Sequence, residues 1–314
     1  MKKLLLLVVA AVSLAGCNRS PEYYFKRANY LFGRGKQLDA LQNYNKAILL
    51  KKSFTEAYVS RGMLYEAQGD RQKAAQDYRN AIESNSSYLP AYNNLGALMM
   101  DGGNYAEAAR IFSEALAIKP DYAFALLNRG LARYKQGDCA EATADLSRAL
   151  DVNPKFELAY YHRGLCARNA KNLPAAVADL NAVLELNPAA FMARLELGKA
   201  LYGLQDYAGS AQQFYQAAEL KPADYFAQYW LALALYKSGD NPGALTAGLS
   251  AAELKPESYQ ARGLIGDVYA AAGDKASAIV EYKAAAALAP KFASFYQARL
   301  AALNAPARPI RVRR

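Results

Sequence analysis

Apolar residues recur along most of the chain with the spacing of one face of an α-helix. Ala91-Tyr92-Asn93-Asn94-Leu95-Gly96 belongs to one such stretch, in which apolar positions return every three or four residues. Glycine interrupts the pattern between stretches, as at Gly103, and proline ends it, as at Pro120. The pattern predicts an all-α chain built from pairs of amphipathic helices.

The helix pairs repeat with a strict period of 34 residues. The prolines that end them, each 34 residues from the next, are Pro120, Pro154, Pro188, Pro222, Pro256 and Pro290. A small residue inside the first helix keeps the same interval; it is Gly62, Gly96, Gly130, Gly164, Gly198 and Gly266, with Ala28 and Ala232 at the two remaining places. Small residues there let the two helices approach closely, and large ones on the second helix, such as Tyr78 and Phe112, fill the space between them.

A 34-residue period with these residues resembles the tetratricopeptide repeat. The resemblance implies an α-solenoid of eight helix pairs over residues 21–292, followed by a capping helix over 293–305 and a basic tail over 306–314. The eight repeats are expected to begin at Pro21, Thr55, Leu89, Ala123, Glu157, Phe191, Tyr225 and Tyr259. Lys171 and Gln205 stand where the glycine of the turn is expected, and Gly248 replaces the large residue of the second helix; these departures weaken single repeats and leave the assignment intact.

The first residues have the pattern of an export signal. Lys2 and Lys3 precede an apolar run over 4–14, too short for a membrane span, and Leu14-Ala15-Gly16-Cys17 follows. The order of two small residues and a cysteine resembles the bacterial lipobox. That resemblance implies cleavage of a signal peptide, 1–16, and acylation of Cys17, so that 17–20 is a lipidated (palmitate-bearing) anchor; Asn18 then favours the periplasmic face of the outer membrane. The alternative is an ordinary signal peptide with an incidental cysteine.

Catalytic chemistry is not expected. The chain has one histidine, His162, which we interpret as a packed or surface residue. It has no phosphate-binding glycine loop, paired-carboxylate motif or metal-spaced cysteine and histidine cluster, so no cofactor or metal is expected. The net charge of +10 is concentrated partly in the tail, and without a motif that combines stacking with basic residues it does not indicate nucleic-acid binding.

Two cysteines remain besides Cys17. Cys139 begins a second helix and Cys166 lies in the first helix of the next repeat. Neighbouring helices and an oxidising compartment allow a disulfide between them, and two buried small side chains are the alternative.

A partner-binding groove is expected along the first helices of the repeats. In tetratricopeptide proteins the second, fifth, ninth, twelfth and thirteenth places of each repeat typically line it. In the fourth to seventh repeats those places are apolar and tyrosine-rich with a few cations, and the candidate residues are Phe124, Leu127, Leu131, Tyr134, Lys135, Tyr161, Leu165, Arg168, Leu195, Lys199, Tyr202, Phe226, Tyr229, Leu233, Tyr236 and Lys237. The alternative is that some of these side chains pack between neighbouring repeats.

The expected function is a non-catalytic, lipid-anchored protein-binding scaffold in bacterial envelope assembly. Its ligand is expected to be an extended peptide or an amphipathic helix of an envelope protein. Signal, lipobox and repeats together resemble two kinds of tetratricopeptide lipoprotein: pilotins, which escort a secretin subunit in pilus assembly and are slightly favoured, and adaptors of peptidoglycan hydrolases and synthases. Tyrosine also stacks on sugars, so a glycan-binding protein of exopolysaccharide export is a further alternative.

Overall fold

The computed structural model describes residues 19–304. Those residues form seventeen α-helices and one short 3-10 helix, with no strand among them. No helix of this part of the chain is both long enough and apolar enough to cross a membrane. The expected signal peptide, the lipidated Cys17 and the basic tail over 306–314 lie outside the described residues.

The helices alternate as pairs along the chain. The first helices of the pairs are α2 (Pro21–Gly33), α4 (Thr55–Ala67), α6 (Leu89–Asp101), α8 (Ala123–Lys135), α10 (Glu157–Asn169), α12 (Phe191–Gly203), α14 (Tyr225–Ser238) and α16 (Tyr259–Ala271). The second helices are α3 (Gln37–Leu50), α5 (Arg71–Ser84), α7 (Tyr105–Ile118), α9 (Cys139–Val152), α11 (Leu173–Leu186), α13 (Tyr207–Leu220), α15 (Asn241–Leu254) and α17 (Lys275–Leu288). The 3-10 helix η1 (Pro290–Phe292) and α18 (Ala293–Asn304) follow. The predicted fold class, an all-α solenoid of eight helix pairs with a capping helix, is confirmed.

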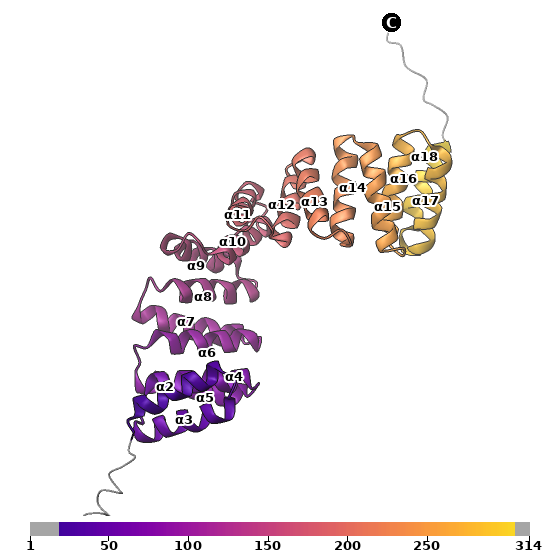
Figure 1. Cartoon of the computed structure of the whole chain (residues 1–314). Helices are drawn as coiled ribbons and strands as arrows, with labels where there is room; N and C mark the ends of the chain where they lie inside the picture. The colour runs from indigo at the N-terminus through magenta and orange to yellow at the C-terminus, as the bar shows by residue number, and fades with distance from the viewer. Residues whose placement is uncertain (1–18, 305–314) are drawn as a thin grey trace, which may run out of the picture. The chain divides into compact units, whose positions relative to one another are not determined.

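The chain divides into two compact units, a first unit up to Pro154 and a second unit from Lys155. Within each unit every helix packs against the helix before it and the helix after it (Figure 1). The first helices of successive pairs also contact one another: α2, α4, α6 and α8 in the first unit, and α10, α12, α14 and α16 in the second. We call these first helices the inner row of each unit.

Close packing within a pair depends on the glycine at the eighth place of the repeat. A Cβ atom on Gly96 would lie 2.5 Å from the ring of Phe112, and one on Gly62 would lie 2.7 Å from the ring of Tyr78. The rings therefore occupy the space that a side chain would need. The seventh repeat reverses the sizes, because the small residue of α14 is Ala232 and it faces Gly248 of α15.

The turn between the helices of a pair requires one residue with a positive φ. Glycine supplies it in six pairs, for example Gly69 with φ 80°. Lys171 and Gln205 adopt the same left-handed conformation, with φ of 60° and 65°, in the two pairs that lack the glycine. The backbone of the turn is thus kept, at the cost of strain in two non-glycine residues.

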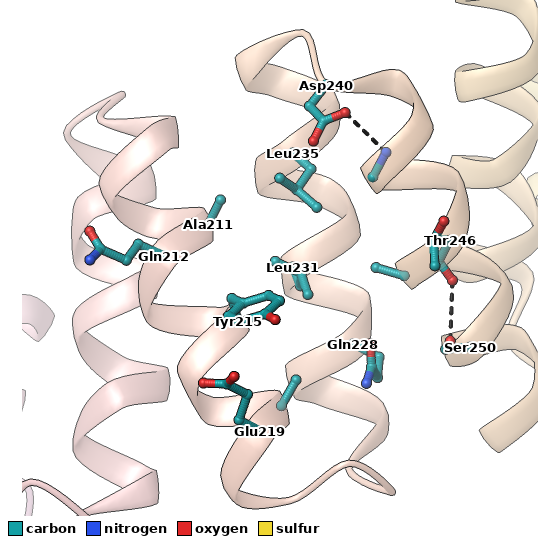
Figure 2. A pocket seen from close by; sticks show the side chains of 13 residues that line it. Ala211, Gln212, Tyr215, Glu219, Gln228, Leu231, Leu235, Asp240, Thr246 and Ser250 are labelled. Carbon is teal, nitrogen blue, oxygen red and sulfur yellow. Dashed lines mark hydrogen bonds between the residues drawn. The ribbon is translucent and has the colours of Figure 1, made fainter.

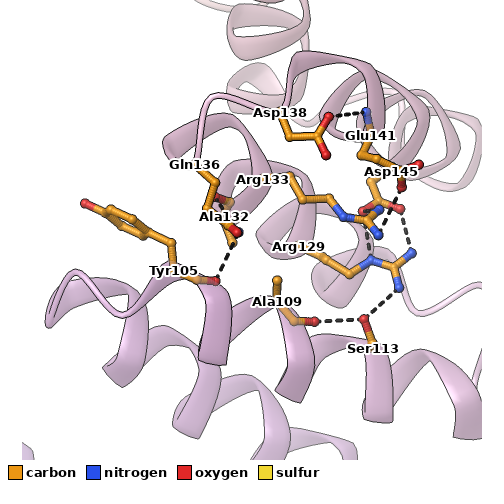
Figure 3. Close-up of polar contacts among 10 residues, drawn as sticks. All are labelled: Tyr105, Ala109, Ser113, Arg129, Ala132, Arg133, Gln136, Asp138, Glu141 and Asp145. Atoms are coloured by element: carbon orange, nitrogen blue, oxygen red, sulfur yellow. Dashed lines mark hydrogen bonds and ion pairs between the residues drawn. The ribbon is translucent and has the colours of Figure 1, made fainter.

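Buried ion pairs join the two helices in three of the repeats. Arg61 donates two hydrogen bonds of 2.7 Å to Asp77, and Arg129 and Arg163 bind Asp145 and Asp179 in the same two-pronged way. The three aspartates are buried. Figure 3 shows that Arg129 also donates to Ser113 of the preceding repeat, at 3.0 Å, so the guanidinium connects neighbouring repeats as well. The sequence analysis did not predict these pairs.

Helix α18 covers the end of the second unit. Tyr296 is buried, and its hydroxyl donates to the carbonyl of Tyr259. A Cβ atom on Gly263 would lie 2.5 Å from that hydroxyl, so the glycine makes room for the tyrosine. Arg299 of the same helix pairs with Asp267 of α16.

Candidate partner-binding groove

The candidate residues of the first unit lie on α8. The side chains of Phe124 and Lys135, near the two ends of the helix, are exposed, and those of Leu131 and Tyr134 are half-buried. Leu127 is buried, at 7% exposure. The surface that α8 offers is therefore smaller than the sequence pattern indicates.

In the second unit two of the expected leucines lie in the interior, whereas Tyr161 and Tyr229 are half-buried. Leu195 is 4% exposed and belongs to the core that joins α12, α13 and α14, and Leu165 at the ninth place is 8% exposed. These two leucines, like Leu127, pack between neighbouring helices. They stabilise the packing beneath the exposed side of the inner row, which we call the inner-row face, and they offer a partner little surface.

In the inner row of the second unit, the most exposed apolar side chains occupy the second place of the repeat. In the second unit they are Leu158, Met192 and Phe226, which are 52, 53 and 57% exposed, on consecutive inner-row helices that contact one another. We call them the second-place row. The sequence analysis named only Phe226 of the three, although the same place gives Leu158 and Met192 directly. A row of exposed apolar side chains is typical of an interaction surface.

An aromatic cluster adjoins this row on α12 and α14. Tyr202 contacts the ring edge of Trp230 at 5.6 Å, Trp230 stacks on Phe214 at 5.7 Å, and Tyr229 stacks on Tyr225 at 5.8 Å between ring centroids. Trp230, the only tryptophan of the chain, was missed by the sequence analysis, which considered the neighbouring Tyr229 alone. The cluster holds Tyr202 and Tyr229 in fixed positions, because each ring has aromatic neighbours on two sides.

Burial raises the pKa of these tyrosines. The pKa of Tyr229 rises to about 12, first because of burial and then because of neighbouring tyrosines, above all Tyr225. Burial also raises the pKa of Tyr202 and of Tyr236, the latter with a contribution from Asp267. All three are therefore neutral at physiological pH and offer apolar faces with polar tips.

The expected cations are partly neutralised within the protein. Arg168 and Lys199 both pair with the buried Glu196 of α12, Lys199 at 2.9 Å. Burial lowers the pKa of Lys199, and the neighbouring Arg168 lowers it further. Lys237 lies over the ring of Tyr236, at 5.9 Å from its centroid. The second-unit part of the candidate site, with Leu233 half-buried among these residues, is thus apolar and aromatic rather than strongly basic.

His162 lies half-buried in α10 and contacts the ring of Tyr161 at 5.2 Å. The described residues contain no group of three or more histidine, cysteine or acidic side chains able to hold a metal ion. Cys139 belongs to the first unit and Cys166 to the second, so the disulfide stays a prediction. Intact mass with and without reductant after alkylation tests it.

The family of the chain follows from its match to a family model. The tetratricopeptide repeat model matches residues 25–87, 59–123, 127–190, 172–225, 195–258 and 229–291. These overlapping matches cover most of the chain, and the protein belongs to the tetratricopeptide repeat family. Proteins of this family are generally interaction scaffolds without catalytic activity.

Solved structures of similar fold share little sequence with the chain. YrrB, described as a tetratricopeptide repeat protein with an unusual peptide-binding site, is 21% identical with a TM-score of 0.56, over 60% of this chain and 96% of YrrB. PilF of Pseudomonas aeruginosa is 23% identical with a TM-score of 0.56, over 66% and 95%. A tetratricopeptide repeat protein of Parabacteroides merdae is 21% identical with a TM-score of 0.54, over 80% and 98%. No curated protein sequence matches the chain. The likenesses establish the fold.

Proposed function

We propose that the protein is a lipid-anchored scaffold of the bacterial cell envelope that binds an extended peptide or an amphipathic helix on the inner-row face of its second unit. The observation that carries the proposal is the second-place row, Leu158, Met192 and Phe226, beside the aromatic cluster of α12 and α14. The exposed side chains offer apolar area to a partner, and the aromatic rings, already fixed by their neighbours, lose little conformational entropy on binding. The peptide-binding site of YrrB, a protein of similar fold, supports a peptide as the ligand class.

Within this function we favour a pilotin-like escort of a secretin subunit in pilus assembly. The support is the combination of a lipobox-like start with a tetratricopeptide solenoid. An adaptor of peptidoglycan hydrolases and synthases shares the same features and is the second candidate. The aromatic cluster would equally stack on sugars, so co-sedimentation with peptidoglycan or exopolysaccharide tests the glycan-binding alternative.

Affinity capture from cross-linked, solubilised envelopes tests the binding face. The baits are the native protein, the groove variant Leu158→Ala/Met192→Ala/Phe226→Ala, and the control variant Leu186→Ala/Leu220→Ala/Leu254→Ala. The control removes three side chains of comparable exposure, 43, 44 and 40%, from the ends of α11, α13 and α15. We expect the groove variant to recover its partner at least tenfold less, while the control recovers it like the native protein.

The identity of the captured protein then separates the two envelope roles. A secretin or pilus subunit supports the escort, and hydrolases or synthases support the adaptor. The same proteins in equal amounts on all three baits would contradict a site on the inner-row face. Circular dichroism of each variant verifies that the helices are retained. Tyr229 is left in place, because its burial means that its replacement would test the core rather than the surface.

The lipid anchor is tested separately at Cys17. Replacing Cys17 by Ser removes the acylated thiol that the lipobox-like start implies. We expect the native protein to incorporate radiolabelled palmitate and to sediment with outer membranes, and the Cys17→Ser variant to lose both properties. If the native protein sedimented with membranes but incorporated no palmitate, this would argue for an uncleaved signal peptide instead.

A further inference from the structure

A pocket of about 710 Å³ lies on the side of α14 that faces away from the second-place row. Its floor is formed by Gln228, Leu231 and Leu235 of α14, between α13 and α15 (Figure 2). At 100° per residue these three side chains lie about opposite Phe226, Tyr229 and Leu233. The pocket is therefore a separate surface from the inner-row face.

The pocket exists because the seventh repeat has a small residue, Ala247, at a place where other repeats have larger ones. In three other repeats, the seventh residue of the repeat, on the first helix, forms an ion pair with the twenty-third residue, on the second helix. These pairs are Arg61 with Asp77, Arg129 with Asp145, and Arg163 with Asp179. The third repeat has Leu95 and Ile111 there, both buried. The seventh repeat has Leu231 and Ala247, and Gly243 and Thr246 leave further space beside them.

The sixth and the eighth repeats, on either side of the seventh repeat, each have an arginine at the corresponding location. In the sixth repeat Arg194, at the fourth place of its first helix, donates to Gln213, at 3.3 Å, and to Gln216. In the eighth repeat Arg262, again at the fourth place, pairs with Glu281 at 3.2 Å. Gln228 is the fourth-place residue of the seventh repeat, so the seventh repeat has no arginine at the corresponding position beside the pocket.

The rim of the pocket is acidic although the whole chain is basic. Its lining residues include two carboxylates, Glu219 of α13 and Asp240 before α15, and no lysine or arginine. Neither carboxylate forms an ion pair within residues 19–304. Asp240 accepts a hydrogen bond of 3.0 Å from the backbone of Gly243 and thereby caps α15. A chain with a net charge of +10 thus presents an apolar floor between two acids.

We propose that this pocket is a second docking site, for a short amphipathic segment of a partner protein that has leucine-like side chains on one face and arginine or lysine at its ends. The apolar face covers Leu231 and Leu235, and the cations at its ends meet Glu219 and Asp240. The walls from Ala211 to Glu219 and from Gly243 to Ser250 are about 11–12 Å long at 1.5 Å per residue, which matches two turns of a helix.

Fluorescence anisotropy of two labelled peptides with the full chain in detergent solution tests the proposal. The first is a twelve-residue helix with leucine on one face and two arginines at each end, and the second has glutamates in place of the arginines. The charge variant is Glu219→Gln/Asp240→Asn, because asparagine caps a helix as well as aspartate does. Its matched control, Glu253→Gln/Asp274→Asn, makes the same changes one repeat later, where Asp274 caps α17.

We expect the arginine peptide to bind the native chain and the control equally, and to bind the charge variant about tenfold more weakly. Thr246→Trp should prevent binding by filling the pocket, whereas Val280→Trp, at the same place of the next repeat, should not. The proposal would be overturned if the charge variant or the Thr246→Trp variant bound the arginine peptide with the affinity of the native chain, or if the native chain bound both peptides equally.

The tail of the chain is the competing occupant. Its sequence, with Ile310 and Val312 among four arginines, has the chemistry that the pocket accepts. Binding to a chain that ends at Asn304, combined with no binding to the full chain, would assign the pocket to the tail and overturn the partner proposal. Because the second-place row is unchanged in every variant of this experiment, failure here leaves the proposed function standing.

Discussion

The second and the seventh repeats build the same helix pair from opposite choices of side chain. In the second, Arg61 and Asp77 form a buried ion pair and Gly62 receives the ring of Tyr78. In the seventh, Leu231 and Ala247 replace the ion pair, and Ala232 faces Gly248. The comparison teaches that the 34-residue repeat fixes the positions of the helices, while the polarity and the size of the side chains between them remain free. The volume left unfilled in the seventh repeat becomes a pocket.

The largest effect on stability is expected from removing one partner of the ion pair in the second repeat. Arg61→Leu leaves the Asp77 carboxylate buried without its cation, and the free energy of unfolding should fall by about 3 kcal/mol. Urea titration followed by circular dichroism measures it. The control is Arg61→Leu/Asp77→Ile, the pair that the third repeat has as Leu95 and Ile111. It should recover most of the loss, and a double variant as unstable as the single one would contradict the equivalence of the two solutions.

A smaller loss is expected from adding one methyl group to the second repeat. In Gly62→Ala the new Cβ meets the Tyr78 ring at 2.7 Å, and overpacking should cost about 2 kcal/mol. The same methyl in the seventh repeat, Gly248→Ala, meets Ile265 at 3.1 Å and gains helix propensity, so its stability should stay within about 1 kcal/mol of the native value. Thermal unfolding of both variants makes the comparison, and equal losses would show that the two repeats have the same free volume.

Alkaline pH should reveal the contribution of the buried tyrosine Tyr229 to the free energy of unfolding. Burial raises the pKa of Tyr229 to about 12, whereas an unfolded tyrosine ionises near 10. The unfolded chain therefore loses its proton first, and the stabilisation present below pH 10 is lost as the pH rises toward 12, by about 1–2 kcal/mol for this residue. Urea midpoints between pH 8 and 12 should fall less steeply in Tyr229→Phe, and an unchanged slope would contradict the assignment.

The smallest effect concerns the turn, where the second and seventh repeats agree. Both have a glycine with positive φ, Gly69 and Gly239, and the fifth repeat has Lys171 in the same conformation. Lys171→Gly should relieve strain and raise stability by about 0.5 kcal/mol, less than the full strain because glycine also costs entropy. Gly69→Ala should have the opposite sign. Differential scanning calorimetry measures both, and a loss on Lys171→Gly would contradict strain at that turn.

The repeat period made the fold predictable, because glycine, large residue and proline recur at fixed places of every pair. The ion pairs were harder to predict, since Arg61 and Asp77 lie 16 residues apart and the combination occurs in only some repeats. The fifth-place Leu195 was expected on the groove and lies in the core, because neighbouring inner-row helices cover that place. The pocket between α13 and α15 could not be predicted from any single residue. It follows from small side chains on α13 and α15 on either side of α14, which only the folded chain brings together.

Helix α18 has a consequence for how such a chain can grow during evolution. Tyr296 fits the space over Gly263, and Arg299 meets Asp267, so the eighth repeat is shaped for a terminal helix and not for another repeat. If a further repeat followed the eighth, its first helix would lie where α18 lies, and the contacts at Gly263 and Asp267 would have to be rewritten. New repeats can be inserted without that rewriting only upstream of the eighth. The history of duplication should therefore be most recent in the interior of the array and oldest at its end.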